Sequence, residues 1–170
     1  PSSIDLARGE SEFLGEPGRE YMLKTCLEKT ELPENTVVII DCPPSLAVLA
    51  TNCFTAAESL VVPVKPGGFE LRAIAQLTEV VRVLKERVNR ELQIVGAILT
   101  DCQARRAITP QVETELGQFY RVLGQVRSDS KLLYATTDGG MLDLKRSAAL
   151  EDYESVVERL KEELPWLQSN

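Results

Sequence analysis

The chain has 170 residues, 44% of them hydrophobic, which is enough to build one domain around its own core. Its 26 acidic and 19 basic residues give a formal charge of −7, so the chain as a whole is not expected to bind a polyanion, while a local basic patch stays open. The absence of histidine excludes Ser-His and Cys-His nucleophile systems, so any chemistry has to rest on carboxylates, cations and backbone dipoles.

The cysteines and the apolar runs bear on the compartment. The four cysteines show no Cys-x-x-Cys spacing, and in a chain without histidine they predict reduced, structural thiols of a cytosolic protein. No charged-then-apolar leader opens the sequence, and no apolar run approaches the roughly 18 residues that a membrane span needs. We therefore expect a soluble, cytoplasmic protein that does not contact a membrane.

The first elements in chain order are helical. Residues 4–32 have a helical pattern that breaks at the Gly-Glu-Pro-Gly stretch, residues 15–18, and Pro33 is expected to end the second helix. Residues 37–40 are four successive β-branched side chains without alternation, which predicts a strand buried on both faces of a parallel sheet. Asp41 then follows at the carboxyl end of that strand, where open α/β sheets place their ligands.

The remaining elements alternate between helix and strand, which predicts an α/β fold with a mostly parallel sheet and helices on both faces. Pro63 favours an edge position for the strand that contains it. The expected elements are an apolar helix over 45–57, a strand over 59–66, a helix over 70–88, a strand over 93–100, a helix from Thr109 and Pro110 to about Tyr120, a strand over 121–127 and a terminal helix that Ser147 opens.

The stretch "VVIIDCPPSLAVLATNCFTAAESLVVPVKP", residues 37–66, resembles the Walker B region and following strand of the ParA/Soj partition ATPases, which are relatives of MinD among the deviant Walker P-loop NTPases. The segment before it, the helix "FELRAIAQLTEVVRVLKERVN" and the stretch "IVGAILTDCQARRAITPQV" match the same family. The run "IIDCPPSL" is the most specific part, because the acidic strand end, the double proline and the apolar helix occur together. The resemblance implies a P-loop NTPase-like fold.

The resemblance assigns Asp41 the metal-binding and catalytic role, in which it holds a magnesium ion, usually through water, beside bound ATP. Pro43 lies in the same nucleotide-binding stretch; it has no chemistry of its own and, with Pro44, sets the direction of the chain. The alternative from the residues alone is that Asp41 only caps the helix that opens near Ser45.

One family feature is absent. The phosphate-binding loop with its G-K-[ST] signature occurs nowhere in the 170 residues, and the glycine pairs in "KPGGFE" and "TDGGML" read as turns. We therefore expect a single domain, residues 1–170, that corresponds to the C-terminal portion of a ParA-like ATPase and lacks the N-terminal phosphate-loop unit. In the family the phosphate-loop strand lies between the strands equivalent to 37–40 and 60–64. Without it we expect direct pairing of these two strands or an open slot, filled by another chain, by a dimer or by a rearranged sheet.

Further site positions follow from the same resemblance. Thr100 and Asp101 lie where the family contacts the nucleotide base, and Val126 and Arg127 match the second base-side segment, in which valine replaces the usual proline. The family binds DNA without sequence preference through cations gathered in its ATP-bound dimer. The candidates here, each of which is also readable as an ordinary surface cation, are Arg105, Arg106, Arg127, Lys131, Lys145 and Arg146.

Three functions remain open at this stage. The first is a ParA-type, Mg²⁺-ATP-dependent switch for chromosome, plasmid or other cargo, which acts as a homodimer with a ParB-like partner and nucleoid DNA. The second is a non-catalytic regulatory module that pairs with a full-length ParA-type partner. The third is a structural α/β domain. In each case we expect no ATP hydrolysis by this chain alone, because it has no phosphate-binding loop.

Overall fold

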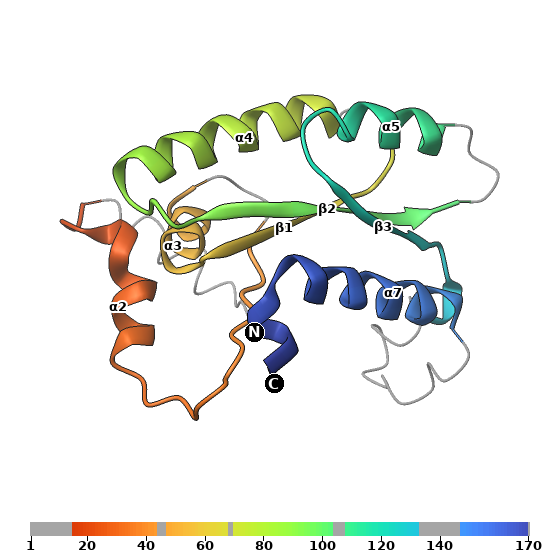
Figure 1. Ribbon diagram of the computed structural model, residues 1–170. Coiled ribbons are helices and arrows are strands. Elements are labelled where there is room, and N and C mark those ends of the chain that lie inside the picture. The colour runs from red at the N-terminus through yellow and green to blue at the C-terminus, as the bar shows by residue number, and fades with distance from the viewer. Residues whose placement is uncertain (1–14, 44–46, 68–69, 104–107, 133–146, 170) are drawn as a thin grey trace. The chain divides into compact units, whose positions relative to one another are not determined.

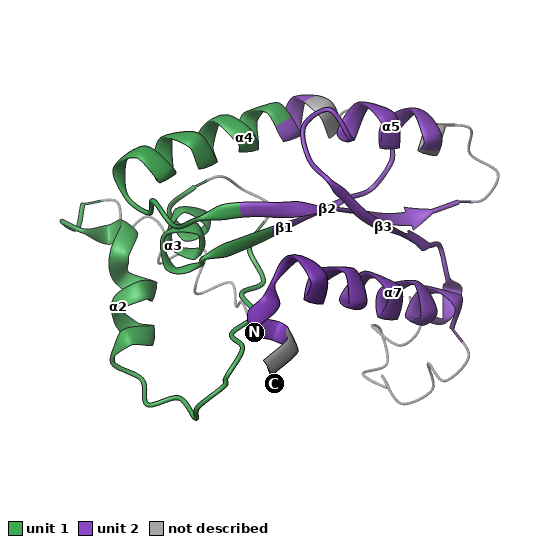
Figure 2. Cartoon of the chain, viewed as in Figure 1, with its two compact units in different colours: residues 1–60, 75–93 green, residues 61–74, 94–170 purple. Residues whose placement is uncertain are grey.

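The computed structural model describes residues 15–43, 47–67, 70–103, 108–132 and 147–169. The chain divides into two compact units (Figure 2): residues 1–60 with 75–93, and residues 61–74 with 94–170. The helix α4 (Glu70–Arg87) begins in the second unit and continues in the first. No helix among the described residues is long and apolar enough to cross a lipid bilayer.

In the first unit, a short helical segment packs on an apolar helix. The turn η1 (Arg19–Tyr21) leads into α2 (Met22–Glu28), and both contact α3 (Val48–Ala56). The buried Asn52 side chain links them, because its oxygen accepts from the Leu23 amide at 3.0 Å and its nitrogen donates to the Arg19 carbonyl at 2.7 Å. The expected stop at Pro33 is wrong: α2 ends at Glu28, where the Lys29 amide bonds back into the last turn.

The end of α3 is closed by a distant side chain. The buried Asn89 amide donates to the carbonyls of Phe54 and Ala57, at 2.9 and 2.7 Å, and to that of Thr55 at 3.2 Å. The last carbonyls of a helix have no partner within the helix, so this one side chain satisfies three acceptors that burial would otherwise leave unpaired. Asn89 thus fixes the point at which the chain leaves α3.

The prediction of a buried strand over residues 37–40 is wrong. They form no strand, and Val37, Val38 and Ile39 are 41%, 46% and 90% exposed instead of buried. The reason is physical: a β-branched run becomes a buried strand only where a neighbouring strand offers its backbone and side chains. Among the described residues nothing forms a ladder with this segment, so of the two expected arrangements, direct pairing with 60–64 or an open slot, direct pairing is not the one present.

The second unit contains most of a three-stranded sheet with the order β1-β2-β3. The strands are β1 (Ser59–Val64), β2 (Gln93–Cys102) and β3 (Val122–Arg127), and β2 pairs with β3 in parallel. The helices α5 (Ile108–Leu116) and α7 (Ala148–Glu163) lie over opposite faces of the sheet (Figure 1), and η3 (Pro165–Ser169) follows α7. The predicted α/β class is confirmed, and β1, with its exposed Pro63, is an edge strand of the described sheet.

The core of the second unit lies between the sheet and α7. Ile98, Leu123, Val126, Ala149 and Val156 form one buried cluster. Two glycines allow the close approach of backbones here. A Cβ on Gly96 would come within 2.6 Å of the Arg121 carbonyl oxygen, and one on Gly124 would come within 2.7 Å of Val156 Cγ2. The elements therefore pack at distances that only a residue without a side chain permits.

Candidate functional site

The candidate site in the second unit lies at the carboxyl ends of the parallel strands, where loops instead of packed side chains meet the solvent. Lys65 follows β1, and its Nζ lies 2.6 Å from Asp101 Oδ2 near the end of β2. The lysine side chain is 68% exposed and the aspartate side chain 36% exposed. The pair is well solvated, so it orients the two groups more than it stabilises the fold.

Asp101 has an unusual backbone. Its φ of 53° lies in the left-handed region, which aspartate tolerates better than most residues. The register between β2 and β3 shifts here, because three steps from Leu99 to Cys102 face two steps from Gln125 to Arg127. The extra residue makes a β-bulge, a device that re-aims side chains at strand ends and beside functional sites. Thr100 and Asp101, the predicted base-side pair, occupy this bulge, and Thr100 is half-buried.

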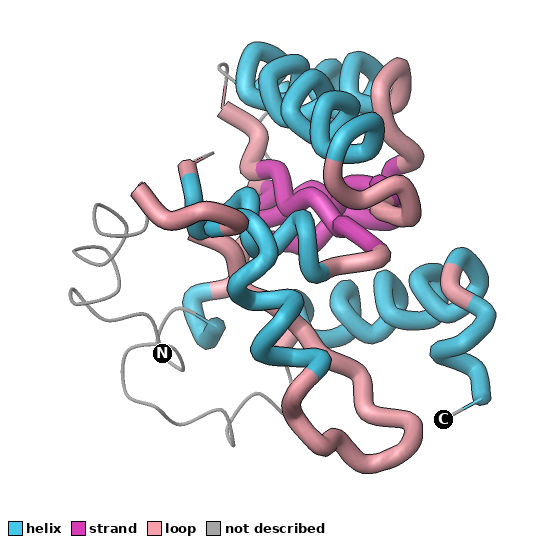
Figure 3. Tube along the Cα trace, turned by 90° about the vertical axis from the view of Figure 1, so that its left-hand side faces the viewer, coloured by secondary structure: helices cyan, strands magenta, loops and turns pink. Residues whose placement is uncertain are grey.

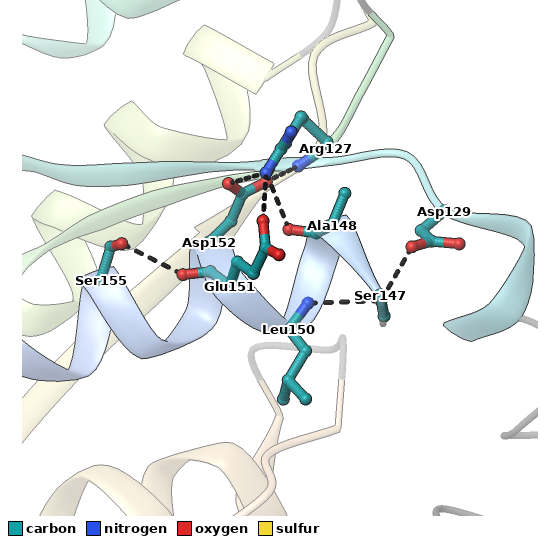
Figure 4. A network of polar contacts seen from close by, with 8 residues as sticks. All are labelled: Arg127, Asp129, Ser147, Ala148, Leu150, Glu151, Asp152 and Ser155. Carbon is teal, nitrogen blue, oxygen red and sulfur yellow. Dashed lines mark hydrogen bonds and ion pairs between the residues drawn. The ribbon is translucent and has the colours of Figure 1, made fainter. Parts of the chain in front are cut away.

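Arg127, at the end of β3, binds the first turns of α7 (Figure 4). Its Nε and Nη2 donate to Asp152 Oδ2 and Oδ1 at 2.8 and 2.9 Å, and its backbone N–H donates to Oδ2 at 2.8 Å. Nη2 also donates to the Ala148 carbonyl at 3.1 Å and approaches Glu151 at 3.4 Å. These hydrogen bonds from the guanidinium lower the pKa of Asp152. We call the contact of Arg127 with Asp152, Glu151 and Ala148 the Arg127 clamp.

The start of α7 is tied to the end of β3 a second time (Figure 4). The Ser147 hydroxyl donates to Asp129 Oδ2 at 2.8 Å and accepts from the Leu150 amide at 3.3 Å, which confirms the predicted helix cap. Asp129 Oδ1 accepts from the Lys131 amide at 2.9 Å. The hydrogen bond from Ser147 is the main cause that lowers the pKa of Asp129. Together with the Arg127 clamp, these bonds hold the start of the loop after β3.

The predicted residues in the second unit fall in different environments. Val126 is 1% exposed and packs in the core, so its side chain does not face a ligand. Arg127 is held in its clamp, and Lys131 is exposed just beyond it. These two are the predicted DNA contacts that the structure describes; outside the described residues lie Arg105, Arg106, Lys145 and Arg146.

Asp41 belongs to the first unit. It is exposed and directly follows segment 37–40, and Pro43 is half-buried. Cys42 and Cys53 of α3 are both free thiols. Burial, with a smaller effect of Cys53 and of the charge of Asp41, raises the pKa of Cys42 to about 12. Cys42 is thus protonated and unreactive at neutral pH, in line with the structural role expected for the thiols.

The donor set at Asp41 is a single carboxylate. The described residues contain no group of three or more histidine, cysteine, aspartate or glutamate side chains that could hold a metal. A single exposed carboxylate fits Mg²⁺, which keeps several of its waters and binds through one or two carboxylates together with phosphate oxygens. The sequence has no loop that cradles those phosphates. These 170 residues therefore fit the metal side of a Mg²⁺-nucleotide site and do not fit the phosphate side.

Sequence reasoning missed two partners in these contacts. Lys65 was not predicted as a site residue, although a lysine immediately after a strand lies at the edge of the sheet where ligands bind. Asp152 gave no signal at all, because its partner Arg127 is 25 residues away along the chain. Asp152 lies in the second turn of α7, and its contact with Arg127 could have been inferred only after the packing of α7 on β3 was known.

Comparison with known proteins identifies the family. Residues 1–94 match the family described as AAA domain. The chain is 37% identical over 121 residues to the sporulation initiation inhibitor protein Soj of Bacillus subtilis and 32% identical over 121 residues to the chromosome partitioning protein ParA of Myxococcus xanthus. It is a ParA/Soj-like member of the AAA domain family. These ParA/Soj alignments cover 71% of this chain but 47% and 42% of the relatives, so the chain spans about half the length of the curated relatives it matches.

Solved structures match the fold of this chain. Cobyrinic acid a,c-diamide synthase from Mycobacterium smegmatis, solved with an ATP analogue and magnesium, is 30% identical with a TM-score of 0.76, and the match covers 95% of this chain and 62% of that one. A plasmid partition protein from Borrelia burgdorferi, solved with AMPPNP, matches with a TM-score of 0.81 and 23% identity over 96% of this chain and 64% of its own. The second match shows the fold alone.

Proposed function

We propose that this chain is the Walker B portion of a ParA-type partition switch, in which Asp41 serves Mg²⁺-ATP and the switch moves chromosome, plasmid or other cargo. The observation that supports this most is the run "IIDCPPSL" around an exposed Asp41 in a chain 37% identical to Soj. Asp41 would hold the ion through water, and Thr100 and Asp101 would lie beside the base. When bound, Mg²⁺ neutralises charge on the phosphates.

The proposal has a second half, which concerns partners. ParA-type switching would proceed through a homodimer, a ParB-like partner and non-specific contact with nucleoid DNA in the cytoplasm. Arg127 already uses Nε and Nη2 for four contacts with acceptors of this chain, so its half-exposed guanidinium has fewer donors to offer such a DNA surface. Lys131, two residues beyond Asp129 and exposed, is the other described cation of the proposed surface.

A second candidate function is a non-catalytic module that pairs with a full-length ParA-type protein. One observation favours it: among the described residues, the exposed segment 37–40 has no strand partner. In this case Asp41 would act only within the complex, at a site whose phosphate side comes from the partner.

The test is titration calorimetry of the chain with ATP and magnesium, beside the mass of the species in solution and an assay of released phosphate. We expect no hydrolysis and no tight ATP binding by the monomer, because the phosphate cradle is missing. A matched pair of variants, Asp41→Asn and Glu28→Gln, removes one exposed carboxylate each from the first unit.

The outcomes separate the functions. When a full-length Soj is added to the chain, the switch and module proposals both predict magnesium-dependent nucleotide binding that Asp41→Asn weakens and Glu28→Gln does not. Hydrolysis in that mixture beyond what Soj alone supports favours the switch, and its absence favours the module. Equal nucleotide binding by all three forms of the chain would contradict any role of Asp41 at a Mg²⁺-nucleotide site.

A further inference from the structure

Arg127 holds the carboxylate of Asp152 with three donors that converge from one residue. Its backbone N–H and its Nε both donate to Oδ2, each at 2.8 Å, and its Nη2 donates to Oδ1 at 2.9 Å. We call these three groups of Arg127 the Arg127 cradle. A guanidinium fork offers two parallel, charge-assisted hydrogen bonds, and proteins use this geometry for carboxylates and for phosphate groups alike.

The Arg127 cradle stays accessible to solvent. Arg127 ends β3 at the carboxyl edge of the sheet, and its side chain is 54% exposed, whereas that of Asp152 is 18% exposed. In Figure 3, α7 is the long helix that leads toward the C-terminus, and it lies on one side of the strands. Asp152 reaches the cradle from the second turn of this helix. The chain thus places its own anion on an arginine that a dissolved ligand can still reach.

The charges around the cradle disfavour a second anion while Asp152 is in place. Glu151 Oε2 lies 3.4 Å from Nη2 of Arg127, and Asp129 follows Arg127 by two residues. With Lys131, this part of the chain has two cations against three carboxylates. A phosphate group would need the same three donors as the carboxylate, and like charges repel at such short range. The two anions therefore exclude each other at the cradle.

We propose that the contact of Asp152 with Arg127 is autoinhibitory: the Asp152 carboxylate occupies the Arg127 cradle, which binds a phosphate group when the start of α7 releases it. An exposed ion pair closes with a modest free energy, so we expect the cradle to be open for about a fifth of the time. The phosphate group belongs either to a nucleic-acid backbone or to a small free phosphate. This inference does not depend on nucleotide switching at Asp41.

The experiment compares Asp152→Asn with Glu154→Gln in the 170-residue chain. Both substitutions remove one negative charge from α7, but only the first removes the anion from the cradle. The probes are a short DNA duplex and inorganic phosphate, each titrated at about 50 mM salt. Asp152→Asn should bind its phosphate ligand about fivefold tighter than the parent chain, because the cradle is then always open. Glu154→Gln should change the affinity by less than about twofold, since an exposed charge outside the cradle is screened.

A double variant and a spectroscopic signal tie the gain to Arg127. Arg127→Gln combined with Asp152→Asn should abolish the gain in affinity, because the cradle has then lost its guanidinium. In the parent chain, nuclear magnetic resonance should show the Arg127 Nε proton and the Asp152 carboxyl carbon shifting together as the ligand is added. This second measurement needs no substitution in the clamp. A contact that only stabilises the fold would leave both resonances in place.

The two probes separate the sources of the phosphate group. A gain for the duplex without saturable binding of inorganic phosphate assigns the cradle to a nucleic-acid backbone. A gain for inorganic phosphate alone assigns it to a free phosphate, in which case the DNA contact proposed for Arg127 fails and this inference stands.

Two results would overturn the autoinhibitory role of Asp152. The first is equal affinity of Asp152→Asn and Glu154→Gln for both probes, even where Lys131→Gln weakens duplex binding and so supports the DNA surface. The second is a gain in affinity that survives Arg127→Gln, since the phosphate group would then bind elsewhere.

Discussion

Two aliphatic runs of similar composition have opposite fates in this molecule. The run "VVII", residues 37–40, is exposed and joins no ladder among the described residues. The run "IVGAIL", residues 94–99, lies in β2, where Ala97 and Leu99 are fully buried and pair with Val122 and Gln125 of β3. Both are patterns typical of buried strands, so the difference arises from the neighbour. Composition gives a segment its tendency to extend, and a paired strand gives it burial.

The largest contrast is expected from truncating one side chain in each run. Leu99→Ala removes a fully buried side chain and should lower the free energy of unfolding by about 2–5 kcal/mol. Ile39→Ala removes a side chain that is 90% exposed and should change it by less than about 0.5 kcal/mol. Urea denaturation measures both. A cost for Ile39→Ala close to that of Leu99→Ala would show that segment 37–40 is buried in solution.

Gly96 lies in the middle of β2, and its substitution tests how closely the backbones of the paired strands pack. Gly96→Ala places a Cβ 2.6 Å from the Arg121 carbonyl oxygen, a backbone atom that cannot move without disturbing the β2-β3 ladder. The substitution should cost about 1–3 kcal/mol in urea denaturation. Its control is Gly15→Ala, where nothing lies within 4 Å of the new Cβ and little change is expected. Equal stabilities of the two variants would mean that the strands are not packed this closely.

Substitution of Asn89 tests whether the end of α3, in the first unit, is held as firmly as the paired strands. Asn89→Ala leaves the carbonyls of Phe54, Thr55 and Ala57 without their shared donor and should lower the free energy of unfolding by about 1–3 kcal/mol. Gln76→Ala on α4 removes an exposed amide side chain and is the matched control. Amide exchange in α3 should rise in the first variant alone. If both variants behave alike, Asn89 does not close α3.

The smallest effect concerns the Arg127 clamp, which is half exposed to solvent and therefore screened. The pKa of Asp152 lies below its ordinary value because Arg127 hydrogen-bonds the ionised form. The clamp thus stabilises the fold above pH about 4, and the contribution disappears as pH falls through the lowered pKa. Asp152→Asn should be slightly less stable than the parent chain at pH 7, and the difference should vanish in acid. Glu154→Gln on the same helix is the control, with no pH-dependent difference expected.

Local rules account for much of what could be predicted. Ser147 caps α7 as its position before an amphipathic stretch indicates, and Pro63 lies in an edge strand of the described sheet, a place that suits a residue without an N–H. The stretch 93–100 predicted β2 and fell short only by the bulged end at Asp101 and Cys102. In each of these cases the cause lies within a few residues of the effect.

Contacts between residues that are distant along the chain could not be predicted from the sequence. Neither the ion pair of Lys65 with Asp101 nor the Arg127 clamp follows a spacing rule, because each depends on which strand or helix packs beside which. Val126 was predicted at the base-side segment, but its side chain lies in the core, since alternate residues of β3 face α7. The prediction of a buried strand over residues 37–40 failed for the opposite reason. The local pattern was strong, but no strand among the described residues pairs with this segment.

Amide hydrogen exchange of the unliganded chain tests the central contrast most directly. We predict that residues 37–40 exchange within about tenfold of the rate of an unstructured peptide, while the Ala97 amide, bonded to the Arg121 carbonyl at 2.8 Å, is protected by about a thousandfold or more. Similar protection of both runs at all chain concentrations would show that segment 37–40 already has a strand partner within the chain, and would contradict this account.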